Sequence, residues 1–258
     1  EAMGGLKREQ FAALPPEAMG GFKPQQFAEL PPEAVEGFRR DQLSALPPKV
    51  MGEMDRKQFG RLSPEAMAGF QPKQFAALPP EAMGGFKPEQ FAALPPEAMG
   101  GFKPQQFAAL PPKAMGGFGP EQFELLPPKL FGEMRPSQFE NLPSEAFEGF
   151  QPGQLKKLPE DLLTVMDPKS FAAINPNAFG GFNPKKFNEL PAKLIGEIEQ
   201  AQFGGLKPKL IGKLSDEVVS AMAPDAFSGI TDKQASKLKP SVAQELTPRQ
   251  IKQLPVEI

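Results

Sequence analysis

The fold of this 258-residue chain is decided by a sixteen-residue stretch, Leu78–Ala93, which reads LPPEAMGG and then FKPEQFAA. Each half begins with a large apolar residue, carries proline at its third position and has a second large apolar residue at its sixth. The same register runs in steps of eight from Leu6 to Leu254, and all 32 first positions are Leu, Phe, Met or Ile. The sixth position is also apolar throughout and is small only at Ala235 and Ala243. The chain is therefore a tandem array of octads, paired as a sixteen-residue repeat.

We expect one tandem-repeat domain over residues 1–258. Residues 1–5 end an incomplete octad, residues 6–158 hold regular repeats, and residues 159–258 hold diverged ones. Copies between Leu78 and Phe118 are almost identical, which indicates growth by duplication of octad pairs. Because the first octad is incomplete, we expect the sequence to be a piece of a longer chain.

The spacing of the apolar residues excludes one long regular element. In a β-strand, the first and sixth positions of an octad would point to opposite faces. In an unbroken α-helix, which advances about 100° per residue, each octad would rotate its apolar pair by about 80°. Neither element gives a consistent apolar face, so the chain must bend once in every octad.

Proline indicates where each helix begins, because it is favoured at the first helical residue and pushes the residue before it towards extended geometry. Where octads differ, the second position carries residues that are favoured as N-caps: Ser63, Asp167, Asn175, Asn183, Ser215, Thr231 and Thr247. Glutamine three residues later gives capping-box spacing in Asp55–Gln58, Thr231–Gln234 and Thr247–Gln250. The predicted fold class is all-α: a solenoid, or superhelix, of very short helices joined by Pro-containing turns, with one helix per octad.

Small residues fill the seventh and eighth positions, as in Gly84-Gly85 and Ala92-Ala93. One interpretation is a glycine helix stop with positive φ. We favour a second interpretation, close approach of neighbouring coils, because alanine occupies the same positions in alternate octads, and a third is that the glycines serve both purposes. The sixteen-residue alternation also favours an even number of octads per coil. We expect two, with the first and sixth positions pointing inward.

The composition removes the residues on which most catalytic and metal sites depend. The chain has no His and no Cys, so the usual nucleophile–base pairs and zinc sites are excluded. Acidic residues recur at the fourth position, where they interact favourably with the helix dipole: Glu17, Glu33, Glu65, Glu81 and Glu97. Lysine replaces glutamate there in other octads, which argues against a calcium-binding ladder. We predict that the protein is not an enzyme, with no catalytic, cofactor-binding or metal-binding residue, no cofactor and no small-molecule substrate.

Charge and aromatic content argue against two further classes of partner. The net charge is −2, from 29 basic and 31 acidic residues spread along the chain, which leaves no basic stripe for nucleic acid. All 23 aromatic residues are Phe, and Leu, Ile or Met replace them elsewhere, which indicates a core rather than a stacking platform for bases. No apolar run approaches the ~20 residues of a membrane-spanning helix. We predict no nucleic-acid binding and no membrane insertion.

Two diverged segments resemble a known repeat family. Ile230–Leu238 reads ITDKQASKL, and Leu246–Leu254 reads LTPRQIKQL. Both resemble the octapeptide tracts L-T-x-x-Q-[IV]-x-x-L of very large secreted or cell-surface bacterial proteins, including adhesin-like and RTX-like ones. The chain departs from these tracts by its frequent proline at the third position and by Phe in place of Ile or Val. The resemblance implies an extracellular stalk or scaffold and transfers no functional residue.

Together these observations predict a non-enzymatic structural repeat module that acts as a spacer or scaffold in a large extracellular bacterial protein. The absence of cysteine fits a secreted or cell-surface location. The alternative is a protein-binding solenoid with a recognition face in the diverged C-terminal repeats, which are richer in lysine: Lys185, Lys186, Lys207, Lys209 and Lys213. Relaxed selection on old copies explains the same divergence. The partners to expect are other proteins or further copies of the chain.

Overall fold

The computed structural model describes residues 3–254, and every regular element in this range is a short helix. There are 31 of them, the α-helices α1–α25 and the 3₁₀-helices η1–η6, and none has seven residues or more. No strand occurs in the described range. Pro-containing turns join the helices at a spacing of roughly eight residues. The predicted all-α solenoid of very short helices is confirmed.

The chain divides into two compact units, Glu1–Ala146 and Phe147–Ile258. The first unit contains α1 (Arg8–Ala12), α2 (Pro16–Met19), α3 (Pro24–Ala28), α4 (Pro32–Val35), α5 (Arg40–Ala45), α6 (Pro48–Met51), α7 (Arg56–Arg61), α8 (Pro64–Met67), α9 (Pro72–Ala77), α10 (Pro80–Met83), α11 (Pro88–Ala92), η1 (Pro96–Gly101), α12 (Pro104–Ala109), η2 (Pro112–Gly117), α13 (Pro120–Glu124), η3 (Pro128–Glu133) and α14 (Pro136–Phe139). The boundary falls within η4 (Ser144–Gly149).

The second unit contains α15 (Pro152–Lys157), α16 (Glu160–Val165), α17 (Pro168–Ala172), η5 (Pro176–Gly181), α18 (Pro184–Asn188), α19 (Ala192–Ile195), α20 (Gln200–Gly204), α21 (Pro208–Ile211), α22 (Asp216–Ala221), η6 (Pro224–Gly229), α23 (Asp232–Ala235), α24 (Pro240–Glu245) and α25 (Pro248–Ile251). The division between the units lies before residue 158, where the sequence begins to diverge. That residues 1–258 act as a single array stays a prediction.

The helices begin where the sequence predicts. Proline is the first helical residue in most octads, and the residue before it is extended, as at Pro79 before α10 (φ −69°, ψ 149°). All seven predicted N-cap side chains accept a hydrogen bond from a backbone N–H of the first turn. The three predicted capping boxes also form. In one of them, the Asp55 N–H donates to Gln58 Oε1 at 3.0 Å, and the Gln58 N–H donates to Asp55 Oδ1 at 2.8 Å.

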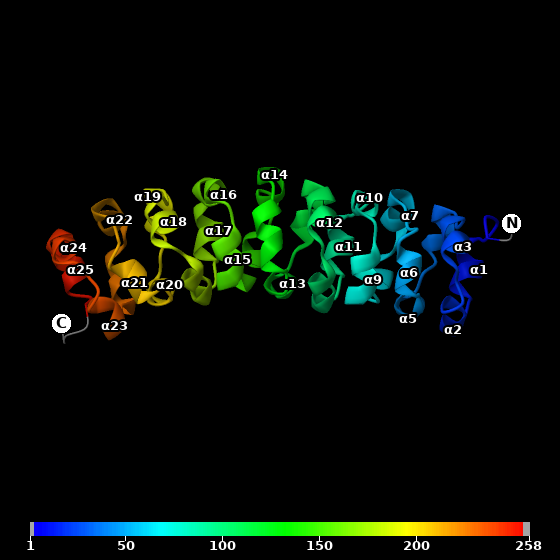
Figure 1. The fold of residues 1–258 in the computed structure, drawn as a ribbon, viewed down its shortest axis with the longest axis horizontal. Helices are drawn as coiled ribbons and strands as arrows, with labels where there is room; N and C mark the ends of the chain where they lie inside the picture. The colour runs from blue at the N-terminus through cyan, green and yellow to red at the C-terminus, as the bar shows by residue number, and fades with distance from the viewer. Residues whose placement is uncertain (1–2, 255–258) are drawn as a thin grey trace. The chain divides into compact units, whose positions relative to one another are not determined.

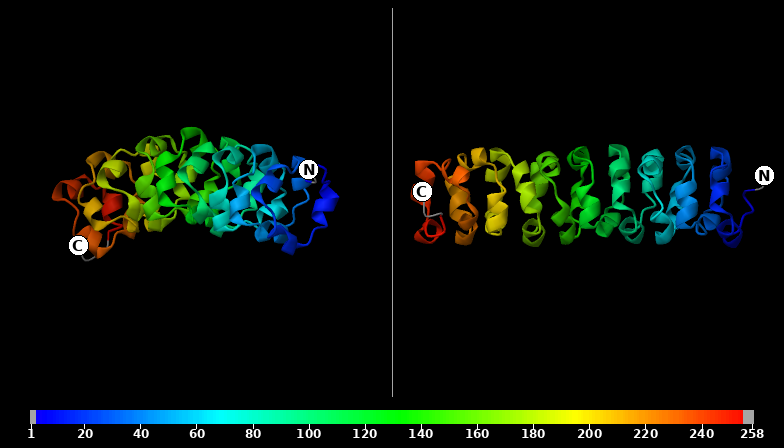
Figure 2. Two further views of the ribbon diagram at one scale, coloured as in Figure 1. Left: turned by 45° about the vertical axis from the view of Figure 1, so that its right-hand side comes forward. Right: turned by 90° about the horizontal axis from the view of Figure 1, so that it is seen from below.

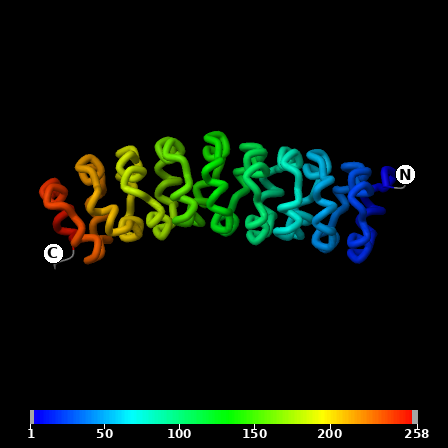
Figure 3. The backbone as a smooth tube through the Cα atoms, in the orientation of Figure 1, coloured from blue at the N-terminus to red at the C-terminus, as the bar shows by residue number. Residues whose placement is uncertain are grey.

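Helices that lie three octads apart pack against each other. In the first unit, α10 contacts both α7 and α12, the third helix before it and the third after it (Figure 1). The coils of this unit form successive layers in the right-hand view of Figure 2, and the backbone trace in Figure 3 returns once per layer. Side-chain hydrogen bonds between coils join residues 28 and 31 positions apart. One coil therefore takes more than three octads and fewer than four.

The expectation of two octads per coil is wrong. Helices two octads apart would have to stack on each other in such a coil, whereas the observed packing is between helices three octads apart. The sixteen-residue alternation has another origin. Octads that begin at Leu6 and every sixteen residues onward mostly carry Gln at the fifth position (glutamine octads), and those that begin at Leu14 carry Ala or another apolar residue there (alanine octads). Because octads pack at an interval of three, each kind packs on the other.

The interior of each unit is continuous from coil to coil. Phe86, at a first position, is 5% exposed, and Phe91, at a sixth position, is fully buried, as the sequence predicts. Rings from successive coils also meet: the centroids of Phe59 and Phe86 are 4.6 Å apart, and those of Phe91 and Phe118 are 4.0 Å apart. Such pairs contribute about 0.5–1.5 kcal/mol beyond their buried area. No octad has a core of its own, so stability depends on stacking.

Glycines of the alanine octads lie where coils pass closest to each other. A Cβ on Gly101 would lie less than 3.0 Å from the carbonyl oxygen of Pro72 in the preceding coil, and Gly117 has the same relation to Pro88. No described glycine has a positive φ. The close-approach interpretation is confirmed, and the helix-stop interpretation is wrong, because these glycines provide space rather than unusual backbone angles.

Candidate functional site

The most regular polar feature of the molecule is a row of buried glutamines in the first unit. The glutamine ladder comprises the fifth-position residues Gln42, Gln58, Gln74, Gln90, Gln106, Gln122 and Gln138. Gln90 is representative. Its Oε1 accepts a hydrogen bond from the Lys87 N–H at 3.0 Å, and its Nε2 donates to the carbonyls of Phe59 at 2.9 Å and Leu62 at 2.8 Å. One side chain thus caps its own helix and binds that helix to the preceding coil.

The ladder compensates for the shortness of the helices. The first four N–H groups and the last four C=O groups of a helix have no partner within it, so most backbone groups of a five-residue helix need one from outside. A buried group without a partner costs about 1–3 kcal/mol. Among the described residues, no buried side-chain nitrogen or oxygen lacks a hydrogen-bond partner. The ladder is therefore a structural device, and it offers no free buried polar atom to a ligand.

Sequence reasoning missed the fifth position, since it places only the first and sixth positions inside. The signal for burial was present: apart from Ser170 and Lys186, this position holds Gln or an apolar residue, and it never carries Gly or Pro. The capping-box spacing explained the glutamine locally, and this local explanation concealed the contact with the preceding coil. A residue that serves two partners, one local and one 28–31 residues away, gives only the local pattern in sequence.

The second unit keeps the ladder only in part. Gln202 repeats the pattern: its Oε1 accepts from the Glu199 N–H at 3.1 Å, and its Nε2 donates to the carbonyl of Ile174 at 3.0 Å. Three other ladder positions hold different residues, namely Ser170, Lys186 and Val218. Ser170 instead donates from its hydroxyl to Asp167 Oδ2 at 2.5 Å.

Lys186 places a charged group on a ladder position. The residue is 5% exposed, and its ammonium donates to the carbonyls of Leu155 at 3.1 Å, Lys156 at 3.1 Å and Leu158 at 2.6 Å. Burial lowers the pKa of Lys186 below its ordinary value, and the Glu160 carboxylate acts in the opposite direction. An ammonium can donate to the same carbonyls as the glutamine amide, but it cannot accept a hydrogen bond from the N-cap N–H.

The five lysines predicted to be the first place to look for a partner have different environments. Lys186 is inside. Lys185 is exposed and pairs with Glu160 at 3.0 Å and with Glu189 at 3.9 Å. The hydrogen bond between Lys185 and Glu160 raises the pKa of the lysine and lowers that of the glutamate. The remaining three, in one octad, are exposed: Lys207, Lys209 and Lys213. A role for them in binding stays a prediction.

The recurring glutamates lie where the dipole argument places them. All five are exposed in the first turn of their helices: Glu17, Glu33, Glu65, Glu81 and Glu97. In residues 3–254, no three or more acidic side chains are grouped so that they could hold a metal ion. The carboxylates therefore form a repeated surface feature rather than one special place.

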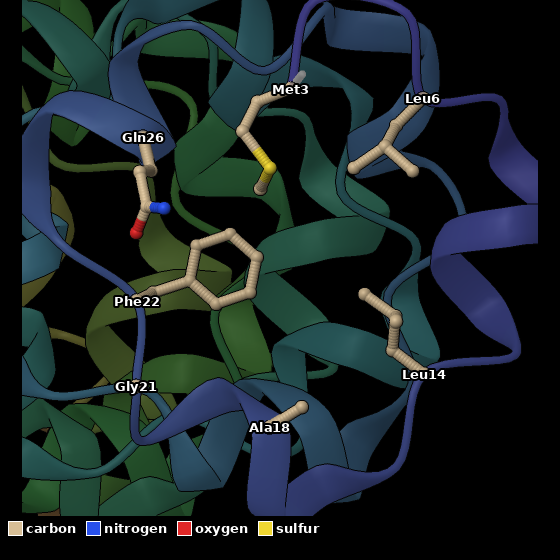
Figure 4. Close-up of a pocket in the computed structure, with 7 residues that line it drawn as sticks. All are labelled: Met3, Leu6, Leu14, Ala18, Gly21, Phe22 and Gln26. Carbon is tan, nitrogen blue, oxygen red and sulfur yellow. The ribbon is translucent and has the colours of Figure 1, made fainter. Parts of the chain in front are cut away.

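An apolar pocket of about 410 Å³ opens at the first coil, and Met3, Leu6, Leu14 and Phe22 line it (Figure 4). Leu6 and Leu14 occupy first positions, which are buried in most later octads, but here they are only partly covered because no described coil precedes them. For the same reason Gln26 stays exposed. Its Oε1 accepts a hydrogen bond from the Lys23 N–H at 2.9 Å and so caps its own helix. The pocket is thus the uncovered core surface of the stack.

Comparison with known proteins adds no family to this description. No protein-family model matches the chain, and no curated protein matches it. None of the helices within residues 3–254 is long and apolar enough to cross a membrane. The likeness to octapeptide tracts of large bacterial surface proteins stays a prediction from the sequence.

Proposed function

We propose that this chain is a non-enzymatic repeat module that acts as a spacer or scaffold in a large extracellular bacterial protein. The observation that carries the proposal is the constant geometry of the ladder. From Gln42 to Gln138, every ladder glutamine donates to the carbonyls 31 and 28 residues before it. Each coil therefore presents the same contacts to the next, and length can change by whole repeats without new interactions.

The extracellular part of the proposal rests on the likeness to surface-protein octapeptides and on the absence of cysteine. The non-enzymatic part is supported by a composition without His or Cys. The alternative, a recognition face in the diverged C-terminal octads, has less support. Two of its five lysines already make internal contacts, since Lys185 pairs with Glu160 and Lys186 donates to backbone carbonyls.

The test is to lengthen the first unit by known steps. One, two or three extra copies of Leu78–Ala93 are inserted after Ala93, which preserves the alternation of glutamine and alanine octads. We expect the maximum dimension from small-angle X-ray scattering to grow by equal steps, with helical circular dichroism rising in proportion. The melting temperature should stay constant or rise, because each inserted pair brings its own stacking contacts.

A single inserted octad, Phe86–Ala93, is the matched control. Because octads pack at an interval of three, this insertion stacks glutamine octads on glutamine octads and alanine octads on alanine octads across the junction. The glycine contacts and the ladder hydrogen bonds there then lose their partners. We expect a lower melting temperature for this insertion only. Equal destabilisation by both kinds of insertion, or an unchanged particle dimension after the pair insertions, would count against a spacer built from interchangeable coils.

A further inference from the structure

One octad of the first unit differs from the regular glutamine octads mainly at exposed positions. Met54–Arg61 reads MDRKQFGR, whereas the corresponding glutamine octad Phe86–Ala93 reads FKPEQFAA. The inward positions of Met54–Arg61 stay buried, with Met in place of Phe at the first position, and the ladder bonds of Gln58 to Phe27 (3.1 Å) and Leu30 (2.9 Å) are intact. The exchanged positions bring in Arg56, Lys57 and Arg61 and remove proline and glutamate, while Asp55 replaces the lysine of the second position. The core does not require these changes.

The exchanged side chains line a groove that we call the basic groove. It has a volume of about 750 Å³ and lies across successive coils of the first unit. Its walls carry four cationic side chains, Arg56, Lys57, Arg61 and Lys87. Among the described residues that line it, Glu33 is the only carboxylate.

Most of this positive charge is not compensated. Arg61 pairs with Glu36 at 2.6 Å. The side chains of Arg56, Lys57 and Lys87 have no ion pair or hydrogen bond with any described residue. Exposed cations elsewhere, such as Lys49 and Lys113, also lack ion pairs with described residues, so the distinguishing feature of these three is that they line one hollow. Three free cations around one hollow create a local positive potential that attracts an anionic ligand.

Glycines also line the basic groove. Gly60, Gly84 and Gly85 line it, and a Cβ on Gly60 would lie 3.2 Å from the carbonyl oxygen of Gly85. Most other glutamine octads of the first unit place Ala at the position of Gly60, as at Ala92. These glycines lie where two coils approach each other, and they leave this part of the groove without side chains.

The chemistry of the walls selects among anions. No aromatic side chain lines the groove, so bases and sugar rings find no stacking surface. The Arg56 guanidinium can bind a carboxylate through two parallel hydrogen bonds. In an extended peptide, every second side chain points to the same face, at a spacing of about 6.6 Å, which would place several carboxylates along one groove. We propose that the basic groove binds an extended acidic peptide segment of a partner protein, a role beyond that of a spacer.

The proposal is tested with the full chain and a fluorescein-labelled octapeptide of alternating glutamate and glycine. Fluorescence anisotropy should show saturable binding at about 50 mM NaCl and weaker binding at about 300 mM, because salt screens exposed charges. The triple variant Arg56→Gln, Lys57→Gln, Arg61→Gln should lose at least about tenfold in affinity. The control triple variant Lys49→Gln, Lys113→Gln, Lys129→Gln removes the same charge from exposed positions outside the groove and should change affinity less than about twofold.

Several results would overturn the proposal. Equal losses in the two triple variants would show attraction to the overall charge rather than to the groove. Tighter binding of a labelled single-stranded RNA octamer, or full competition by inorganic phosphate at millimolar concentration, would assign the groove to a different anion. Salt-sensitive dimerisation of the chain alone, lost in the groove variant, would assign it to a second copy. Circular dichroism melts of both triple variants verify that each one folds.

Discussion

The regular part of the first unit and the second unit build the same helices with different interiors. In the first unit, ladder positions from Gln42 to Gln138 all hold glutamine, whereas Ser170, Lys186 and Val218 interrupt the series in the second. Both units keep one short helix per octad and bury their first and sixth positions through most of their length. The comparison shows that one helix per octad and the buried apolar columns persist where three of the ladder glutamines are replaced. The ladder adds contacts between coils without defining the path of the chain.

Other polar groups replace part of the ladder in the second unit. Near Val218, the side chain of Asn188 accepts from the Ser215 N–H at 3.0 Å and donates to the Lys213 carbonyl at 2.8 Å. Asn188 is at a seventh position, where the regular octads carry Gly or Ala. A group at a different position thus joins the same two coils, which explains how the second unit accommodates Val218.

The largest expected difference between regions concerns the sixth position. Phe91→Asp buries a charge without a partner in the regular stretch, where Phe91 is fully buried. We expect a loss of more than about 4 kcal/mol in unfolding free energy, measured by urea denaturation with circular dichroism. Ala243→Asp, at the same position in the last coils, is the control, because Ala243 is exposed. It should change stability by less than about 0.5 kcal/mol. If Phe91→Asp lost as little stability as Ala243→Asp, the sixth position would not be part of the core in the regular octads.

Breaking the ladder in the first unit should have the next largest effect. Gln90→Val copies the residue found at Val218 and removes one acceptor and two donor interactions. No asparagine like Asn188 is available there, since Gly60 occupies the corresponding seventh position in the preceding coil. We expect a loss of about 3 kcal/mol by urea denaturation, because buried backbone groups are left without partners.

Gln26→Val separates the two roles of the glutamine. Gln26 accepts from the Lys23 N–H at 2.9 Å but is exposed at the first coil, so only the cap is lost. This variant should lose less than about 1 kcal/mol. If Gln90→Val lowered the unfolding free energy no more than Gln26→Val, the hydrogen bonds between coils would contribute nothing measurable. The glutamine ladder would then no longer support the spacer proposal.

The same contrast explains what the sequence could and could not predict. The helix, its proline start, its caps and its two apolar columns follow from interactions within eight residues, and all of these are confirmed. The number of octads per coil depends on how side chains fill the interior, and the glutamine contact depends on residues 28–31 positions away. Neither leaves a local pattern. The basic groove combines residues as distant as Glu33 and Lys87, although the unusual composition of Met54–Arg61 was visible in the sequence.

Close approach of coils gives a prediction with an adjacent control. Gly101→Ala would place a Cβ against the carbonyl of Pro72, so the coils must separate. We expect a loss of about 1–3 kcal/mol in urea denaturation. Gly100→Ala meets nothing within 4 Å, and its backbone has no positive φ. It should stabilise the chain by about 0.4–1 kcal/mol through the unfolded state. A loss of stability in both variants would point to the loss of glycine flexibility rather than to contact between coils.

The smallest expected effect comes from restoring the ladder at Lys186. Lys186→Gln replaces a buried ammonium by an amide that can donate to the same carbonyls and also accept from the Asn183 N–H, as Gln90 accepts from Lys87. We expect a gain of about 1 kcal/mol at pH 7, measured by urea denaturation. If the wild type were more stable than Lys186→Gln at this pH, the site would favour the ammonium over the amide. The replacement of glutamine by lysine would then have stabilised the second unit.

The pH dependence gives this comparison a second readout. Burial holds the pKa of Lys186 in the folded state below its ordinary value of 10.5. Between these two pKa values the unfolded chain binds more protons than the folded one, so the contribution of Lys186 to stability rises with pH in this window. The advantage of Lys186→Gln should therefore be largest at neutral pH and shrink as the pH approaches 10.5. The ion pair of Lys185 with Glu160 is present in both proteins and largely cancels in the difference. A gain that stays constant up to pH 10.5 would mean that the amide's extra hydrogen bond, rather than relief of a buried charge, distinguishes the glutamine ladder from its lysine substitute.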